Sequence, residues 1–197
     1  MNTTKAKCRD SETKVLKCIA QQDFTRLKNI IVIKAPQDSG KTTILKMVIH
    51  KLYERDPKSW IGRCKSRPRD NQYDIKRVTN YAAANCESAE YSGVFSCNGV
   101  VVAVSTVGDF TKYIVGNFEL FAKAKAVIGV MAVREGNIAE FSYDLFKSKL
   151  NFNEEVIKIP EKKYNDAKWT KAEDDAAEQV VQIIDMLVEA HNKCAIH

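Results

Sequence analysis

The sequence predicts an α/β protein in which a largely parallel sheet carries one β-hairpin and is covered by helices on both faces. Two short apolar runs, at residues 30–34 and 126–133, have the composition of buried strands. Each run precedes a segment whose apolar residues recur at helical spacing. Strands that alternate with helices are typical of a three-layer α/β fold with a mostly parallel sheet.

The expected helices are defined by their apolar stripes and by the residues that flank them. Ser11 is the candidate N-cap of the first helix. The stripe of the second helix consists of Ile44, Leu45, Val48 and Leu52. Helices are expected at residues 11–22, 41–55, 111–123, 138–149 and 171–193.

The expected strands are short and are bounded by turn residues. The pair Asn98-Gly99 is a strong hairpin turn signal between two apolar segments. Residues 57–69 are basic and irregular, so we expect a loop there. Strands are expected at residues 30–34, 74–81, 94–95, 100–104, 126–133 and 156–159.

Length and composition indicate one soluble domain. The chain has 197 residues, enough for a continuous core, and no linker divides it, so we expect a single domain over residues 1–197. Its N-terminal helix is expected at about 11–22 and its core at about 28–197. No secretory signal and no apolar run of about 18 residues is present, so we expect a cytoplasmic protein with no membrane partner. The six cysteines include no C-x-x-C pair, so neither a zinc site nor a disulfide framework is expected.

The motif that carries chemistry lies between the predicted strand at 30–34 and the predicted helix at 41–55. Its residues are Ala35, Pro36, Gln37, Asp38, Ser39, Gly40, Lys41 and Thr42. A chain that leaves a strand, turns tightly and starts a helix directs its backbone N–H groups at an anion. Gly40 allows close backbone approach, Lys41 can reach β- and γ-phosphates, and the Thr42 hydroxyl can ligate Mg²⁺.

This motif, in this context, resembles the P-loop NTPase superfamily. The direct resemblance covers about residues 30–45, and the order of strands and helices extends it over most of the chain. It implies that Lys41 and Thr42 are the phosphate and magnesium residues and that the backbone of Gln37 to Thr43 is the phosphate cradle. It also implies a P-loop NTPase-like domain with Mg²⁺ and a nucleoside triphosphate as cofactors. Ala35 departs from the usual first glycine, a change that many P-loops carry.

Asp38 is an acid inside a loop that is expected to hold phosphate. It could hold a water molecule, accept a proton from a substrate hydroxyl, or face solvent. We favour the solvent-facing orientation, because a carboxylate beside a phosphate is repelled by it.

A second group of candidate residues follows the strand at 100–104. The pattern of an Asn-Gly hairpin, Ser-x-x-Gly-Asp, a helix and an apolar strand ending in Arg resembles small bacterial P-loop proteins of uncharacterised function. That resemblance makes Gly108, Asp109 and Arg134 the second half of the site. Asp109 either reaches the magnesium shell through water, or N-caps the next helix, or does both. Arg134 either neutralises charge on a transferred phosphoryl group or pairs with Glu135 or Glu140 at the surface.

The expected activity is phosphoryl transfer from Mg-ATP to a small-molecule acceptor, or hydrolysis of the nucleotide. ATP is expected in preference to GTP, because the sequence has no Asn-Lys-x-Asp motif for guanine. One alternative is a nucleotide-dependent switch that binds a protein partner through residues 105–110. Another is a nucleic-acid-associated ATPase, because the positive charge of the chain concentrates in the stretch 58–77. That stretch could also be a solvated loop or a mobile arginine-bearing segment over the phosphates.

Overall fold

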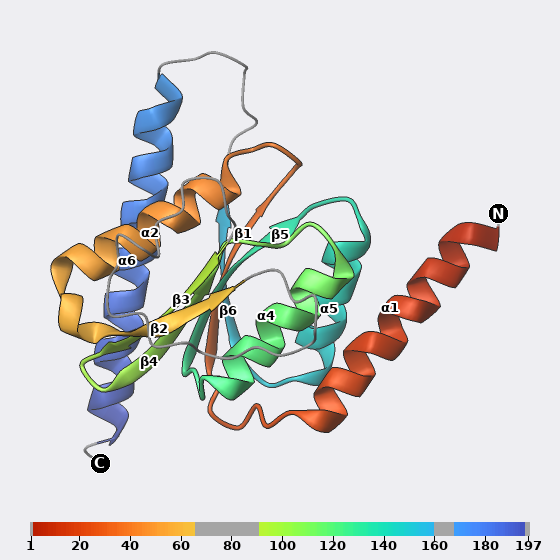
Figure 1. Ribbon diagram of the computed structural model, residues 1–197, viewed down its shortest axis with the longest axis horizontal. Helices are drawn as coiled ribbons and strands as arrows, with labels where there is room; N and C mark the ends of the chain where they lie inside the picture. The colour runs from red at the N-terminus through yellow and green to blue at the C-terminus, as the bar shows by residue number, and fades with distance from the viewer. Residues whose placement is uncertain (1, 66–90, 160–167, 196–197) are drawn as a thin grey trace.

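The computed structural model describes residues 2–65, 91–159 and 168–195 and contains a six-stranded sheet in the order β2-β3-β4-β5-β1-β6 (Figure 1). The strands are β1 (Asn29–Ala35), β2 (Trp60–Lys65), β3 (Tyr91–Cys97), β4 (Val100–Ser105), β5 (Ile128–Arg134) and β6 (Asn153–Lys158). The helices of the described residues are α1 (Asn2–Gln21), α2 (Lys41–Arg55), α4 (Thr111–Lys123), α5 (Ile138–Lys149) and α6 (Lys168–Ala195). A short 3₁₀ turn, η1 (Pro57–Ser59), precedes β2.

The sheet is mixed but mostly parallel, which confirms the α/β prediction. Strands β4, β5, β1 and β6 run parallel to one another, and β3 is antiparallel to both β4 and β2. The predicted hairpin is present between β3 and β4. Its turn residues Asn98 and Gly99 have φ of 49° and 82°, the left-handed values that a two-residue hairpin turn requires.

Helices cover both faces of the sheet (Figure 1). Successive residues of β1 point to opposite faces, so Ile31 and Ile33 pack in the cluster with α2 and α6. Ile30 and Val32 pack in the other cluster, with α1, α4 and α5. This two-sided burial explains why β1 is a continuous apolar run in the sequence.

Two sequence expectations about local structure were wrong. Ser11 is not an N-cap, because α1 begins at Asn2 and the buried Ser11 side chain hydrogen-bonds Thr111 Oγ1 at 2.8 Å. The start of the expected loop at 57–69 is instead η1 and the edge strand β2. Trp60 anchors that strand, since its ring lies 5.1 Å from that of Phe95. Sequence periodicity cannot detect an aromatic contact between distant segments.

Helices α2, α4 and α5 have the bounds that the sequence predicted. The predicted strand at 74–81 lies outside the described residues, as does most of the basic stretch 58–77. No helix in the described ranges is long and apolar enough to cross a membrane.

Helix α4 packs closely on β5 because residue 129 is a glycine. A Cβ at Gly129 would lie 2.7 Å from the ring of Phe121, which is fully buried. We predict that Gly129→Ala lowers the free energy of unfolding by about 1–3 kcal/mol through overpacking. Urea denaturation measures this change. The double variant Gly129→Ala/Phe121→Leu should lose less stability than the sum of the single variants, and strict additivity would contradict this account.

Candidate functional site

The site lies where three parallel strands end together. Ala35, the last residue of β1, pairs with Arg134, the last residue of β5. The N–H of Glu135 donates to the Ala35 carbonyl at 3.1 Å, and the N–H of Arg134 donates to the Gly108 carbonyl at 3.1 Å. The structure therefore brings together the three segments that the sequence singled out after β1, β4 and β5, at the sheet edge where α/β proteins bind ligands.

The backbone between β1 and α2 turns through two left-handed residues. Asp38 has φ of 57° and Gly40 has φ of 85°. Asp and Gly are the residue types that tolerate this conformation, so the local sequence suits the turn. The Asp38 side chain is exposed, in agreement with the solvent-facing orientation that we favoured.

The first turn of α2 contains N–H groups that lack an acceptor within the helix. Gly40 is the N-cap and provides no side-chain cap. The first intrahelical bond is the one from Ile44 N to Gly40 O, at 3.0 Å. The N–H groups of Lys41, Thr42 and Thr43 consequently have no intrahelical acceptor, as in every helix N-terminus. The partial positive charge of the helix end is therefore uncapped on the side that faces the loop.

The Lys41 ammonium is enclosed by the loop. The residue is only 6% exposed, and its Nζ donates to Ala35 O at 3.0 Å, to Ser39 Oγ at 3.2 Å and to Pro36 O. All three acceptors are neutral. Burial lowers the pKa of Lys41, and the charge of Arg134 acts in the same direction, whereas Asp109 opposes both. The site therefore holds a buried cation without a carboxylate among its hydrogen-bond partners.

Thr42 connects α2 to the segment that follows β4. Its hydroxyl donates to the Thr106 carbonyl at 3.2 Å across 64 positions of sequence. The hydroxyl proton is used in this bond, so the lone pairs of Oγ1 remain available to a cation. An oxygen with available lone pairs is the type of ligand that Mg²⁺ prefers.

Asp109 does not cap the next helix, so that part of the expectation was wrong. The N-cap of α4 is Phe110, and no side chain caps that helix. Asp109 stands one residue too early, and its carbonyl accepts from Asn137 Nδ2 at 3.0 Å. Its carboxylate is partly exposed, and its charge raises the pKa of Lys41.

Arg134 forms no ion pair with Glu135 or Glu140 in the described part of the chain. Glu140 instead accepts from Gly136 N at 2.8 Å, and its carboxylate is 4.0 Å from Lys34. The surface pairing that we considered for Arg134 is therefore not formed with either glutamate. The guanidinium influences Lys41 through its charge, so it belongs to the same edge of the sheet.

Sequence reasoning missed two asparagines that hold the site. Asn117 is buried within α4, and its Nδ2 donates to Val107 O at 2.8 Å. Asn137 caps α5 through its Oδ1, which accepts from Ala139 N at 2.7 Å, and it also holds Asp109. A polar residue on the apolar stripe of a predicted helix was the available signal for Asn117.

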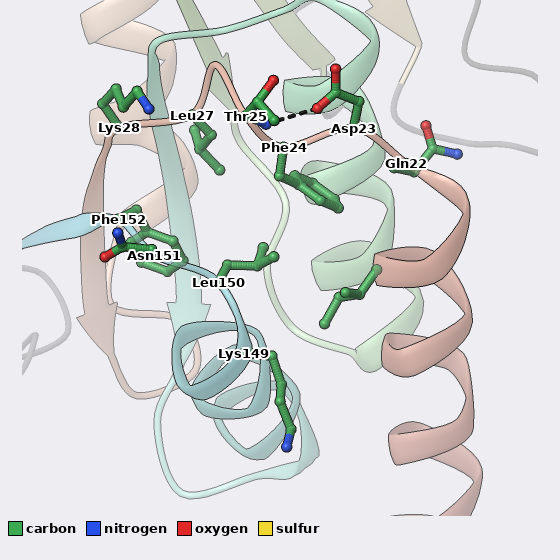
Figure 2. Close-up of a pocket in the computed structure, with 11 residues that line it drawn as sticks. Gln22, Asp23, Phe24, Thr25, Leu27, Lys28, Lys149, Leu150, Asn151 and Phe152 are labelled. Atoms are coloured by element: carbon green, nitrogen blue, oxygen red, sulfur yellow. Dashed lines mark hydrogen bonds between the residues drawn. The ribbon is translucent and has the colours of Figure 1, made fainter.

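One hollow of the described surface lies away from these residues. It has a volume of about 410 Å³ and lies at the amino-terminal ends of β1 and β6, the opposite end of the sheet from Lys41. Figure 2 shows Phe24, Leu27 and Leu150 around it, with the Asp23 carboxylate accepting from Thr25 N. This hollow is not part of the candidate site, which is defined by charge and by backbone donors.

Comparisons with other proteins add no relative. No protein-family model matches the chain, and neither the curated proteins nor the solved structures include a match. No group of three or more His, Cys, Asp or Glu that could hold a metal ion occurs in the ranges that the structure describes.

We predict that the free energy of unfolding rises more steeply with pH in the wild type than in Lys41→Met. The pKa of Lys41 is lowered in the folded protein, so above that pKa the unfolded chain binds more protons than the folded one, up to the ordinary value of 10.5. The slope of stability against pH is therefore more positive in the wild type than in the variant.

Urea unfolding from about pH 7 to about pH 10 tests this, since the slope of stability against pH reports the proton difference. Lys28→Met is the matched control, because Lys28 is an exposed lysine at the other end of β1 and its removal should leave the slope unchanged. A slope that is equal in the wild type and Lys41→Met would contradict the buried-ammonium account.

Proposed function

We propose that the protein binds the phosphates of a nucleoside triphosphate, with Mg²⁺, through residues 35–43, as a P-loop protein does. The observation that carries the proposal is the Lys41 ammonium, which is buried at the positive end of α2 and whose hydrogen-bond acceptors within the described residues are all neutral. The ammonium and the partial positive charge of the helix end repel each other where water is largely excluded. This repulsion raises the free energy of the folded protein. A phosphate bound between them removes this repulsion and accepts from the N–H groups of the first helical turn, which have no intrahelical acceptor.

Lys41 can turn to a phosphate without leaving its present acceptors unsatisfied. The Ala35 carbonyl also accepts from Glu135 N, and the Pro36 carbonyl also accepts from Ser39 Oγ at 2.8 Å. Loss of a buried hydrogen bond is costly mainly when it leaves a partner unpaired. Lys41 can therefore replace its hydrogen bonds to the loop oxygens with hydrogen bonds to phosphate oxygens at little cost in free energy.

The residues at the loop fit a magnesium ion that is shared with phosphates. Mg²⁺ prefers oxygen ligands and keeps several waters, so one or two protein oxygens are sufficient. Thr42 Oγ1 would be the direct ligand, because its proton is already donated to Thr106 O. Asp109 would act through a bound water. When bound, the ion supplies neutralisation of charge on the phosphate oxygens.

The proposed reaction is transfer of the γ-phosphoryl group to a small acceptor hydroxyl, or to water. The acceptor oxygen bonds to the γ-phosphorus while the bond to the β–γ bridging oxygen breaks, and the nucleoside diphosphate leaves. Arg134 is placed beside Ala35 by the β1–β5 register and would stabilise the charge on the transferred group. Asp109 is the acid of this edge and would receive the acceptor proton or hold the magnesium water.

ATP is the proposed nucleotide, because the sequence lacks the Asn-Lys-x-Asp motif that recognises guanine. The nucleic-acid alternative rests on the basic stretch 58–77, of which the structure describes only residues 58–65. The switch alternative concerns residues 105–110, of which Thr106 and Val107 are buried.

We predict that wild-type protein binds Mg-ATP with micromolar affinity and that Lys41→Met weakens binding at least about 100-fold, since it removes a charged hydrogen-bond donor from the phosphates. Isothermal titration calorimetry with Mg-ATP and Mg-GTP measures both the affinity and the base preference. Lys41→Met should unfold at a urea concentration no lower than the wild type, so the loss of binding is not a loss of fold.

Lys28→Met is again the matched control and should bind Mg-ATP as the wild type does, because Lys28 lies at the amino end of β1. Folded wild-type protein that binds neither nucleotide would refute the proposed function. Equal binding by Lys41→Met and wild type would refute the role of Lys41.

A further inference from the structure

Four successive backbone carbonyls after β4 are each held by a different element of the fold. We refer to residues 106–109 as the anchored segment. The donors are Thr42 Oγ1 of α2 to Thr106 O, Asn117 Nδ2 of α4 to Val107 O, the N–H of Arg134 in β5 to Gly108 O, and Asn137 Nδ2 at the start of α5 to Asp109 O. The distances are 3.2, 2.8, 3.1 and 3.0 Å in that order. An irregular segment with every carbonyl satisfied by a separate element cannot move without breaking several bonds together.

Packing restrains the same segment. Thr106 and Val107 are 0% and 4% exposed. A Cβ at Gly108 would lie 1.9 Å from the carbonyl oxygen of Ala132, so the backbone of the segment is pressed directly onto β5. There is no free volume on that side into which the segment could shift.

Asn117 is the most consequential of the four anchors. It is 3% exposed, and its Oδ1 accepts from Ser105 Oγ at 2.6 Å, while Ser105 Oγ accepts from Ser92 Oγ at 3.1 Å. The amide orientation is thereby determined, because the oxygen faces Ser105 and the nitrogen must face Val107. If Val107 moved, a buried amide donor and a buried carbonyl would both lose their partners.

A nucleotide-dependent switch at this segment would need two arrangements of similar free energy. The ligand would have to bind one of them far more tightly in order to compensate for the broken bonds. The anchored segment has the opposite character, since its bonds come from four elements that are themselves packed in the core. The contacts therefore favour a site that is already formed before the nucleotide arrives.

We propose that Asn117 is a positioning residue that keeps the anchored segment in one conformation in both the free and the nucleotide-bound protein, so that the Thr42–Thr106 contact and Asp109 are preorganised. This inference rests on the proposed nucleotide binding. Of the alternatives considered, it favours an enzyme over a nucleotide-dependent switch, because residues 106–109 would form a rigid part of the site and not a moving loop. Asn117 acts on the magnesium side of the site through Val107 and Thr106, and not by contact with the ligand.

Nuclear magnetic resonance hydrogen exchange on wild-type protein, with and without Mg-ATP, tests the rigidity. The two probes are the backbone N–H of Arg134 and the side-chain amide of Asn117, because each donates directly to the segment. Both should be protected in each state, with protection that differs less than about threefold. Loss of protection at either probe in one state would show a moving segment and overturn the inference. Absence of nucleotide binding would instead refute the proposed function.

Asn117→Asp tests the positioning role, because it keeps the size of the side chain and the acceptor for Ser105 but removes the donor to Val107. We expect the ratio of Mg-ATP affinity to Mg-free ATP affinity to fall about tenfold at about pH 8, since one hydrogen bond is replaced by a repulsive contact. Mg-free affinity, which depends on residues 35–43, should stay within about twofold. Below about pH 6 the ratio should recover toward the wild-type ratio at the same pH, because a protonated carboxyl can donate to Val107 O.

Ser92→Ala is the matched control, since it removes a hydrogen bond from the same buried network and leaves the bond from Asn117 to Val107 in place. It should lower stability slightly and leave the magnesium ratio unchanged. If Asn117→Asp is too unstable to purify, Asn137→Ala provides the second test, with the same expected loss of the ratio through release of Asp109. An unchanged ratio in a folded Asn117→Asp or Asn137→Ala protein would overturn the proposal.

Discussion

The structure depends on one constraint: the backbone groups at the carboxyl ends of β4, β5 and β1 must be hydrogen-bonded where the regular sheet stops. The bonds from Arg134 N to Gly108 O and from Glu135 N to Ala35 O meet this requirement and join the three strand ends. They do so because the strands are parallel and in register, so their ends reach the same edge. Every candidate site residue is attached to this junction.

Charged side chains of both signs surround Lys41 at the junction. The Lys41 ammonium is buried among neutral oxygens and lies beside the positive end of α2, with Arg134 near enough to depress its pKa further. The carboxylates of Asp109, Asp38 and Glu135 act on that pKa in the opposite direction. A fold that places its cations in this way favours an anion that can be shared among several donors. Phosphate has the charge and the number of oxygen acceptors to match them.

Sequence reasoning succeeded where a signal is local and failed where a contact is distant. Helix α2 has the predicted bounds because its apolar stripe repeats regularly and Gly40 marks its start. Ser11 was misread as a cap, because the apolar stripe of the helix starts only at Val15, whereas α1 extends back to Asn2. The strand at Trp60 was read as a loop, because its stabilising contacts come from Tyr53 and Phe95 and not from its own alternation.

The sequence by itself determined the chemistry available between β1 and α2. Asp38, Gly40, Lys41 and Thr42 are neighbours along the chain, so their spacing alone sets the turn, the start of the helix and the reach of the ammonium. The tertiary structure alone decided what surrounds that turn. Asn117, Asn137 and Thr42 converge on residues 106–109 from three different helices, and Thr42 does so from 64 positions away. No periodicity in one sequence encodes that convergence, because it follows from the strand order and from the way the helices pack on the sheet.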